Sequence, residues 1–367
     1  MKRIAIKEVC EVYDGPHATP KKTDNGPVYL GIDAITEDGM LDPSQFAHLS
    51  EEDYVKWTKR VTPQENDIVF SYEATLGRYA VIPKNFYGCL GRRLAIVRII
   101  NDELNAKWLY YYFRSPEWTS FIKNQTVKGS TVDRISIEEF PEYTIPVISL
   151  EDQNKIVDVL DKIDRKIADN KKINDYLEQQ ALLIFRYMFK NISNGSNHVG
   201  DYITPKRGKA LLSKDAISGQ FPVIAGGLLP ATYHNRANTV APVLTISGSG
   251  ANAGYVNIWH DPIWSSDSSF IDYEMTTNVY FWYAFLKLRQ QDIFDIQTGS
   301  AQPHIYPKHI AELSIGNMDR FQIASYITQV TPLFTKAGAN IRETKRLQQL
   351  RDWLLPMLMN GQVTIED

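Results

Sequence analysis

One glycine-rich segment of the sequence contains residue types that could support catalysis. Gly248 to Ala253 (GSGANA) fits the loose dinucleotide-binding fingerprint and follows an apolar strand, and Asp272 lies near the position of the expected acid. However, Gly254 to Trp259 alternates like a strand, whereas phosphate binding requires the N-terminus of a helix. Ser249 is not a nucleophile elbow, because residue 247 is Ser and not Gly. This segment therefore does not indicate a cofactor site.

The other reactive residue types form no catalytic pattern. The seven histidines include no HExxH pair, and we interpret His304 and His309, five residues apart, as polar surface or loop residues. Asp261-Pro262-Ile263-Trp264 lacks the second Pro expected at the target-base pocket of an adenine methyltransferase. Two cysteines, Cys10 and Cys89, are too few for a structural zinc site and favour a reducing compartment. We expect no catalytic residue, metal or cofactor in this chain.

Length and composition describe a folded globular protein of one to three domains. The chain has 367 residues, of which 43% are hydrophobic and 23% charged. There is no N-terminal signal and no run of 18 apolar residues, so we expect a cytoplasmic protein. With 40 basic and 43 acidic residues, the net charge of -3 counts against nucleic-acid binding by bulk charge. Any such binding must come from local patterns.

Local patterns of this kind occur in several loops. Lys and Arg can contact phosphates, and side chains with paired donors and acceptors can read base edges. Two short Gly-Ser turns, at residues 128–131 and 298–300, are the favoured candidates for a phosphate contact, because they expose backbone N–H groups and hydroxyls. The alternative interpretation is that both are structural turns. A solvated loop is the simpler interpretation of each Lys or Arg. The candidates are Lys21, Lys22, Arg78, Arg92, Arg93, Lys128, Gly129, Ser130, Thr131 and Arg134 in the first half, and Lys206, Arg207, Lys209, Asn235, Arg236, Asn252, Thr298, Gly299, Ser300, Gln302 and His304 in the second.

The elements that must position these loops occur twice. The segment Lys128 to Ile135 aligns with Thr298 to Ile305, and a long helical pattern follows each segment. Aromatic helix-like segments precede them, at Trp108 to Phe121 and Tyr280 to Leu288, and a strand-turn-strand unit lies further upstream in each half. Tyr110 to Phe113 could stack bases, but we favour a role in the core. The chain therefore contains a mixed α/β domain and a helix, twice.

The two helical patterns indicate a coiled coil. Apolar residues repeat every 3.5 residues, and a helix of 40 residues, about 60 Å long, cannot bury such a stripe alone. We therefore expect the two helices to pair antiparallel. Asn170 and Asn174 either fix the register or contact a partner, and Pro332 and Gly338 make the second helix less regular. The predicted seam is Ile156, Leu160, Ile163, Ile167, Asn170, Asn174, Leu177, Ala181, Ile184 and Met188, then Ile323, Ile327, Val330, Phe334, Ala337 and Ile341, shifting phase to Leu347, Leu350, Leu354 and Leu358.

These patterns predict an α+β fold with two pseudo-twofold-related mixed α/β domains joined by two long helices in an antiparallel coiled coil. The predicted boundaries are 1–150 for the first domain, 151–190 for the central helix, 191–318 for the second domain, 319–360 for the C-terminal helix and 361–367 for a tail. Two domains held apart by a rod suit a ligand with two separated sites, such as duplex DNA.

The order of these features resembles the DNA-specificity subunit of type I restriction-modification enzymes. The most specific part is the helix opening Glu151 to Val157, with Gln153 and Ile156, together with the twofold arrangement. The resemblance implies a non-catalytic subunit whose two target-recognition domains each read half of a bipartite DNA site. It also implies methyltransferase subunits, two in number, docked on the helices, and a restriction subunit that joins them. S-adenosylmethionine, ATP and Mg would belong to those partners.

This chain departs from the pattern in its second helix. That helix lacks a Gln at the position matching Gln153, which Phe321 and Gln322 straddle, and it contains Pro332. The two partner-docking surfaces are therefore not expected to be equal. Two alternatives remain: a coiled-coil adaptor that binds proteins and no DNA, and a self-sufficient nucleic-acid enzyme with an unrecognised site. Salt-dependent binding to duplex DNA separates the first from a DNA reader.

Overall fold

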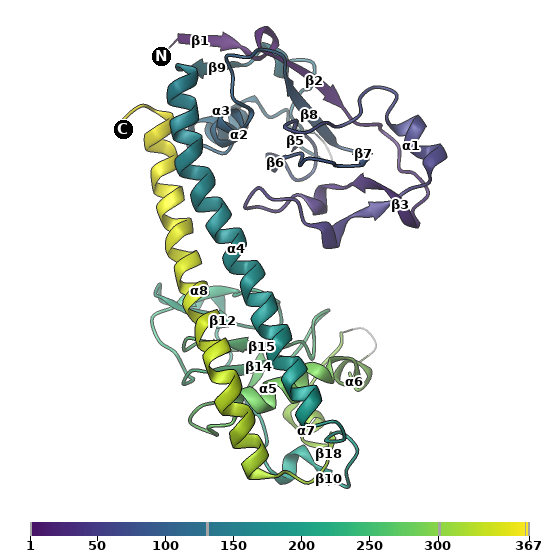
Figure 1. Ribbon diagram of the computed structural model, residues 1–367, viewed down its shortest axis with the longest axis vertical. Coiled ribbons are helices and arrows are strands. Elements are labelled where there is room, and N and C mark those ends of the chain that lie inside the picture. Colours follow the sequence, from purple (N-terminus) through teal and green to yellow (C-terminus); the bar gives the residue numbers. More distant parts are fainter. Residues whose placement is uncertain (1, 130–131, 300–301, 364, 366–367) are drawn as a thin grey trace. The chain divides into compact units, whose positions relative to one another are not determined.

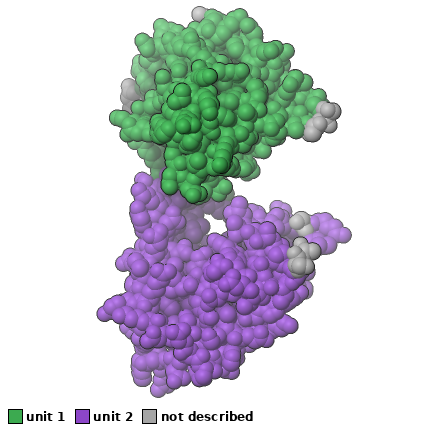
Figure 2. All heavy atoms as spheres, turned by 90° about the vertical axis from the view of Figure 1, so that its right-hand side faces the viewer, with its two compact units in different colours: residues 1–165, 347–367 green, residues 166–346 purple. Residues whose placement is uncertain are grey.

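The structure is a computed structural model that describes residues 2–129, 132–299, 302–363 and 365. It consists of two compact units (Figure 2). Each unit has its own hydrophobic core. Unit 1 contains residues 1–165 and 347–367, and unit 2 contains residues 166–346. Of the predicted phosphate contacts, Ser130, Thr131 and Ser300 lie outside the described residues.

Unit 1 is built from three small sheets and three short helices (Figure 1). Its four-stranded sheet is antiparallel, and its three-stranded sheet contains one parallel pair, β3 with β7. The sheets are β2 (Cys10–Asp14), β8 (Leu94–Ile99), β5 (Ile68–Ser71) and β6 (Tyr79–Val81); β4 (Ala47–His48), β3 (Thr23–Leu30) and β7 (Gly88–Leu90); and β1 (Lys2–Ala5) with β9 (Thr144–Val147). The helices are α1 (Glu51–Trp57), α2 (Ala106–Phe113) and α3 (Pro116–Gln125).

Unit 2 repeats this plan with sheets of four, three and two strands. Its three-stranded sheet again contains one parallel pair, β12 with β16. The sheets are β11 (Lys206–Arg207), β17 (Ser268–Asp272), β14 (Val243–Ser247) and β15 (Val256–Trp259); β13 (Thr232–His234), β12 (Phe221–Ile224) and β16 (Trp264–Ser265); and β10 (Asn197–His198) with β18 (Ser314–Ile315). The helices are α5 (Val279–Leu288), α6 (Gln290–Asp295) and α7 (Pro307–Ala311). The predicted duplication is therefore present in the topology of the sheets.

Aromatic residues form the centre of unit 1. The predicted helix-like segment from Trp108 to Phe121 is two helices, because Ser115 accepts a hydrogen bond from the N–H of Trp118 and caps a new helix that begins at Pro116. The side chains of Tyr110 to Phe113 are all buried, and Phe113 packs on Trp118 with ring centroids 4.6 Å apart. Base stacking by these residues is excluded, and the interpretation as core is confirmed.

Two long helices, α4 (Leu150–Met188) and α8 (Arg320–Met359), extend through both units. In unit 1, the start of α4 shares a core with the end of α8, through Ile156 and Leu160 on one helix and Leu355 and Leu358 on the other. In unit 2, the end of α4 shares a core with the start of α8. The helices are therefore antiparallel (Figure 1), which confirms the predicted fold class of two mixed α/β domains and a helical pair. α8 continues through Pro332 without a break.

The seam of this pair departs from the predicted repeat in both helices. In α4, Phe185 and, just beyond its end, Phe189 are buried, whereas Ile184 and Met188 are only partly buried. An α-helix drifts by about 20° per heptad from a strict 3.5-residue repeat, so the buried face moves to the next residue. In α8, the predictions for Ile341 and Leu350 are wrong, because these side chains are 48% and 42% exposed. The neighbouring residues Asn340 and Arg351 are buried instead, and Asn340 faces α4.

Asparagine side chains form a polar layer between the helices of unit 2. The amide of Asn340 donates to Oδ1 of Asn174 over 2.9 Å, and Asn170 donates to Glu343 over 2.9 Å. The two contacts join α4 to α8 within one helical turn, whereas Oδ1 of Asn170 has no hydrogen-bond partner among the described residues. Of the two interpretations of Asn170 and Asn174, the register-fixing one is therefore supported within unit 2.

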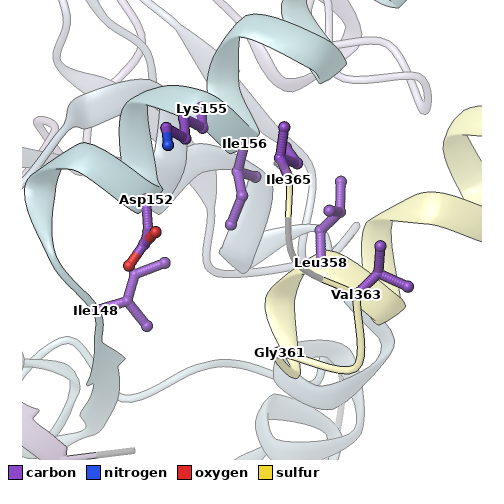
Figure 3. Close-up of a pocket in the computed structure, with 8 residues that line it drawn as sticks. All are labelled: Ile148, Asp152, Lys155, Ile156, Leu358, Gly361, Val363 and Ile365. Carbon is purple, nitrogen blue, oxygen red and sulfur yellow. The ribbon is translucent and has the colours of Figure 1, made fainter. Parts of the chain in front are cut away.

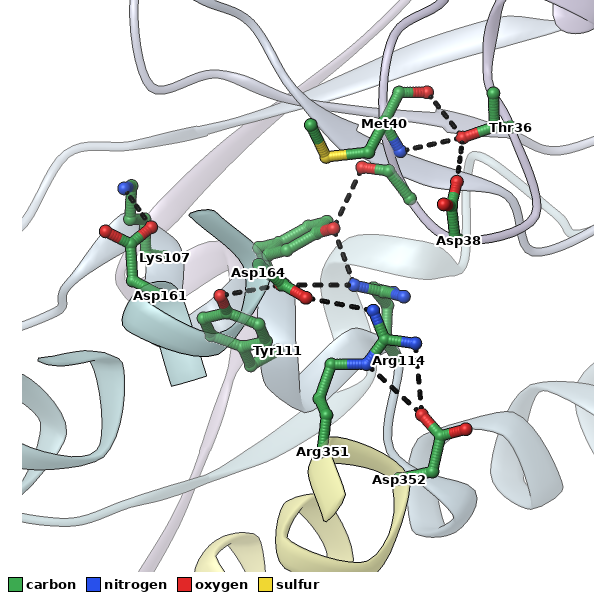
Figure 4. Close-up of polar contacts among 12 residues, drawn as sticks. Thr36, Asp38, Met40, Lys107, Tyr111, Arg114, Asp161, Asp164, Arg351 and Asp352 are labelled. Carbon is green, nitrogen blue, oxygen red and sulfur yellow. Dashed lines mark hydrogen bonds and ion pairs between the residues drawn. The ribbon is translucent and has the colours of Figure 1, made fainter. Parts of the chain in front are cut away.

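A polar network joins α2 of unit 1 to both long helices (Figure 4). Asp164 of α4 accepts from Arg351 of α8 over 2.9 Å and from the hydroxyl of Tyr111 over 2.9 Å. The hydroxyl of Tyr110 donates to the carbonyl of Gly39 over 2.8 Å and accepts from Arg114 over 2.7 Å. The network therefore fixes α2 and the turn at Gly39 against the helices.

A small cavity of about 110 Å³ lies at the start of α4 (Figure 3). It is lined by Asp152, Lys155 and Ile156 of α4, Ile148 before it, and Leu358, Gly361, Val363 and Ile365 at and after the end of α8. Gln153 is fully buried nearby: its amide group donates to the carbonyls of Glu103 and Ile148, both over 3.0 Å, and it accepts from the N–H of Asn105 over 2.8 Å. Gln153 thus ties the start of α4 to the segments of unit 1 that precede it.

Among the helices in the described ranges, none is long and apolar enough to cross a membrane.

Candidate nucleic-acid interface

In unit 1, the candidate loops meet at the end of β5. The N–H of Tyr72, the residue after β5, donates to the carbonyl of Arg93 over 3.1 Å, and its carbonyl accepts from the N–H of Ile135 over 2.8 Å. Arg134 forms β-bridges with both Glu73 and Val127. The strand end is therefore held between Arg93 on one side and Arg134 and Ile135 on the other.

Unit 2 has the same backbone arrangement at the end of β14. Gly248, the residue after β14, donates to the carbonyl of Asp267 over 2.9 Å and accepts from the N–H of Ile305 over 3.0 Å. His304 forms β-bridges with both Ser249 and Thr298. We call this arrangement the strand-end frame of each unit.

The two strand-end frames match residue by residue. The N–H of Gly15 donates to the carbonyl of Leu94 over 2.8 Å, and the N–H of Gly208 donates to the carbonyl of Ser268 over 2.8 Å. Asp14 in unit 1 is therefore equivalent to Arg207 in unit 2. By the same bonds and bridges, the equivalent pairs are Arg93 and Asp267, Glu73 and Ser249, and Arg134 and His304. The same backbone therefore carries different charges in the two units.

In the strand-end frame of unit 1, acids and bases are interleaved. Arg93 forms an ion pair with Glu73 over 3.2 Å, and Asp14 pairs with Arg60 and, over 3.0 Å, with His17. The hydroxyl of Tyr72 has no hydrogen-bond partner within the described part of the chain. Burial and, to a smaller extent, the carboxylates of Asp14 and Glu73 raise the pKa of Tyr72 to about 12, so this phenol is a neutral donor at pH 7.

In the strand-end frame of unit 2, one arginine is held by several groups. Arg207 forms an ion pair with Asp267, which also accepts from the hydroxyl of Ser249. The guanidinium carbon of Arg207 lies 5.9 Å from the ring centre of Tyr306. The rings of His304 and Tyr306 are stacked with centroids 5.9 Å apart.

The two Gly-Ser turns have glycine for steric reasons. A Cβ on Gly129 would lie 2.2 Å from the carbonyl oxygen of Val132, and a Cβ on Gly299, which has a φ of +94°, would lie 2.5 Å from the carbonyl oxygen of Gln302. The bridges that close the turns join Val127 to Arg134 and Thr298 to His304, so the second turn is one residue shorter than the sequence alignment assumed. Lys128, Gly129, Thr298 and Gly299 are exposed, as contact with a phosphate requires.

The remaining candidates lie outside the strand-end frames, except Arg92, which is exposed next to Arg93. Arg78 donates to the carbonyl of Ile35 over 3.0 Å, and its side chain is 24% exposed. Asn252 is half-buried in the turn before β15. The others are exposed: Lys21 and Lys22 before β3, Lys206 and Lys209 at β11, Asn235 and Arg236 after β13, and Gln302 in the second Gly-Ser turn.

The sequence analysis did not identify the acidic residues of the strand-end frames or the tyrosines Tyr72 and Tyr306. Asp14, Glu73 and Asp267 repel phosphates, and a search for phosphate contacts passes over them. A signal was present, because the aligned strands ending at Ser71 and Ser247 place Glu73 and Ser249 at the same offset. Carboxylates that hold arginines in place suit base edges, which are read by paired donors and acceptors.

The comparisons with known proteins agree on one family. Residues 1–179 match the family model described as the type I restriction modification DNA specificity domain. The type I restriction enzyme MjaIX specificity subunit of Methanocaldococcus jannaschii is 23% identical over 361 residues, which cover 87% of this chain and 82% of that protein. A putative type I restriction enzyme specificity subunit of Haemophilus influenzae is 28% identical over 123 residues, or 32% of this chain and 29% of that protein.

A solved structure has the same fold. The S subunit of a type I restriction-modification system from M. genitalium matches with a TM-score of 0.57 and 19% identity, covering 97% of this chain and 95% of that one. The similarity therefore extends through both units and both long helices.

Proposed function

Because the chain belongs to the DNA-specificity subunits of type I restriction-modification systems, we propose that it reads a two-part DNA site, one half-site with each unit. The observation that carries this proposal is the duplicated strand-end frame. The matched backbone hydrogen bonds place charged and polar side chains at equivalent positions, and the side chains differ between the units. Two readers with one scaffold and different side chains suit two half-sites of different sequence.

We also propose that methyltransferase subunits dock on the long helices. Four large apolar side chains are exposed on the part of α4 that belongs to unit 2, although the opposite face of this helix is buried. Their spacing of three, seven and four residues places them on one face of the helix. They are Ile173, Tyr176, Leu183 and Tyr187. In unit 1, α8 exposes Leu350 and Trp353, three residues apart. Exposed stripes of this kind favour a partner helix.

The proposed role of this chain is recognition without catalysis. Burial raises the pKa of both thiols, Cys10 and Cys89, to about 12, which leaves them protonated and poor nucleophiles at pH 7. Asp261 of the Asp-Pro-Ile-Trp segment forms an ion pair with Arg342 of α8 over 2.9 Å. S-adenosylmethionine would be bound by the methyltransferase subunits, and ATP and Mg by a restriction subunit.

Methylome sequencing of a host with and without the gene, expressed with its methyltransferase partner, tests this function. We expect a two-part motif with a gap of fixed length, and replacement of residues 191–318 by the matching segment of another specificity subunit should change one part of the motif only. Binding of the assembled complex to duplex DNA should fall steeply with salt. A flat salt response with no motif would favour the protein-binding adaptor. Methyl transfer by the isolated chain would contradict the non-catalytic role.

A further inference from the structure

Arg207 is the exposed cation that the strand-end frame of unit 2 holds most firmly. Its side chain is 39% exposed, so its guanidinium can reach a ligand. It nevertheless has two neighbours that restrict it: the carboxylate of Asp267 and the ring of Tyr306, 5.9 Å away. An arginine that is already held in one orientation loses little conformational entropy when it binds.

The surroundings of Arg207 are themselves fixed. Asp267 accepts from the hydroxyl of Ser249, and its backbone carbonyl accepts from Gly248 over 2.9 Å. A Cβ on Gly248 would lie 2.4 Å from Nη1 of Arg207 and 2.8 Å from Oδ1 of Asp267. The guanidinium therefore lies directly against the backbone at the end of β14, in a space that only glycine leaves open.

This arrangement suits a base edge better than a phosphate. The side chain of Asp267 is 36% exposed beside Arg207, and its negative charge would repel a phosphate at the same place. Guanine presents two acceptors, O6 and N7, in the major groove, which match two N–H groups of one guanidinium. Nη2 donates to Asp267, and within the described part of the chain the guanidinium makes no other side-chain hydrogen bond, so its remaining N–H groups are available to a ligand.

We propose that Arg207 reads a guanine in the half-site of unit 2, with Asp267 as the residue that positions it. The matching residue in unit 1 is Asp14, an acceptor paired with His17 and Arg60, so this strand position cannot read guanine in the same way there. The guanine contact therefore belongs to one half of the motif. This inference rests on the proposed function and adds the identity of one recognised base.

Methylation by the assembled complex of a DNA library randomised in one half-site at a time tests this assignment. The variants are Arg207→Lys, which keeps a cation beside Asp267, and Asp267→Asn. The matched control is Arg236→Lys, the same change at another exposed arginine of unit 2. We expect Arg207→Lys to reduce the preference for guanine at one position by about 10- to 100-fold, the range for one bidentate contact, without a change in the other half-site. Asp267→Asn should reduce it by a smaller factor.

The outcomes separate this inference from the proposed function. An unchanged guanine preference in both variants, or a loss spread equally over all library sequences in Arg207→Lys, would overturn the base contact and indicate a phosphate contact. Uniform weakening is the result expected for the control. If the wild-type complex methylated no two-part site at all, the proposed function itself would fail. Thermal unfolding of each variant complex checks that the fold is kept.

Discussion

Burial of His260 in unit 2 should make the stability of the protein depend on pH. His260 follows β15 and packs against α8, where its ring centre is 6.0 Å from that of Phe334. The contact is close, because a Cβ on Gly338 of α8 would lie 2.8 Å from the Cβ of His260. Its Nδ1 is buried and has no hydrogen-bond partner among the residues that the structure describes. Burial lowers the pKa of His260 from 6.5 to about 4, although Asp261 opposes this change.

The pH dependence of stability follows from this lowered pKa. Above pH 6.5 the imidazole is neutral in both states and costs nothing. As the pH falls from 6.5 toward 4, the unfolded state takes up a proton that the folded state does not, so stability is lost. We expect a loss of about 1–2 kcal/mol between pH 7.5 and pH 5, which His260→Gln should remove. Urea unfolding at both pH values measures it, with His198→Gln, an exposed histidine, as control. Equal pH dependence in all three proteins would contradict the prediction.

At the level of single residues, the sequence identified basic residues but not their partners. Arg93, Arg134, Arg207 and His304 were candidates, and all four lie in the strand-end frames. Residue type alone does not distinguish an arginine held by a carboxylate from a solvated one. The bond from Arg78 to the carbonyl of Ile35 likewise depends on a segment 43 residues away, so it could not be predicted from the local sequence.

The long helices were predictable as elements because their pattern is local. A 3.5-residue repeat can be read along one segment, and it placed Ile156, Leu160 and Phe334 correctly in the cores. Which of two neighbouring residues faces the partner depends on the other helix. Asn340 faces Asn174 because the two amides pair, and Ile341 is left exposed. The hydrogen bonds of Gln153 to Glu103 and Asn105 join segments 50 and 48 residues apart, so they could not be predicted from the local sequence.

The ion pair between Asp164 of α4 and Arg351 of α8 is the strongest test of helix pairing within unit 1. Arg351 is only 8% exposed, and its other carboxylate partner, Asp352, is itself exposed. Removal of the Asp164 carboxylate therefore leaves the buried guanidinium with only this exposed partner and leaves the hydroxyl of Tyr111 without its acceptor. We expect Asp164→Ala to lower the free energy of unfolding by about 3 kcal/mol. Urea denaturation followed by circular dichroism measures this change.

Asp158 on the same helix provides a matched control. It pairs with Lys162 over 2.6 Å, but both side chains are exposed, at 62% and 71%. Asp158→Ala removes the same side chain with the same gain in helix propensity, so we expect an effect below about 1 kcal/mol. If the two variants were equally stable, the buried network of Figure 4 would not hold the helices together.

For the whole molecule, the duplication was predictable and the chemistry of each reader was not. Repeated spacing of strands, aromatic helices and Gly-Ser turns fixes the plan of both units, because such features are local. The charges of the strand-end frames arise from loops that are distant in sequence, such as residues 14, 73 and 93, which the fold brings together. The two units therefore share a scaffold and can recognise different DNA.

The length of the helices should set the gap between the two half-sites. Insertion of seven residues after Arg165 in α4 and seven after Arg346 in α8, where the units meet in sequence, leaves the contacts inside each unit unchanged. Seven residues lengthen a helix by about 10 Å and keep its faces nearly in phase, since a heptad drifts by only about 20°. At about 3.4 Å per base pair, we expect the unspecified gap to widen by about three base pairs while both half-sites stay the same. Methylome sequencing of a host that carries the variant measures the gap.

An insertion in α4 alone is the control for this experiment. It shifts α4 by seven residues against α8, so Asn174 and Asn340 cannot pair while Asp164 still contacts Arg351. We expect this single insertion to destabilise the helical pair and to abolish methylation. A double insertion that methylates DNA with the original gap would show that the helices do not determine the spacing, and the proposal of two readers separated by a helical spacer would have to be abandoned.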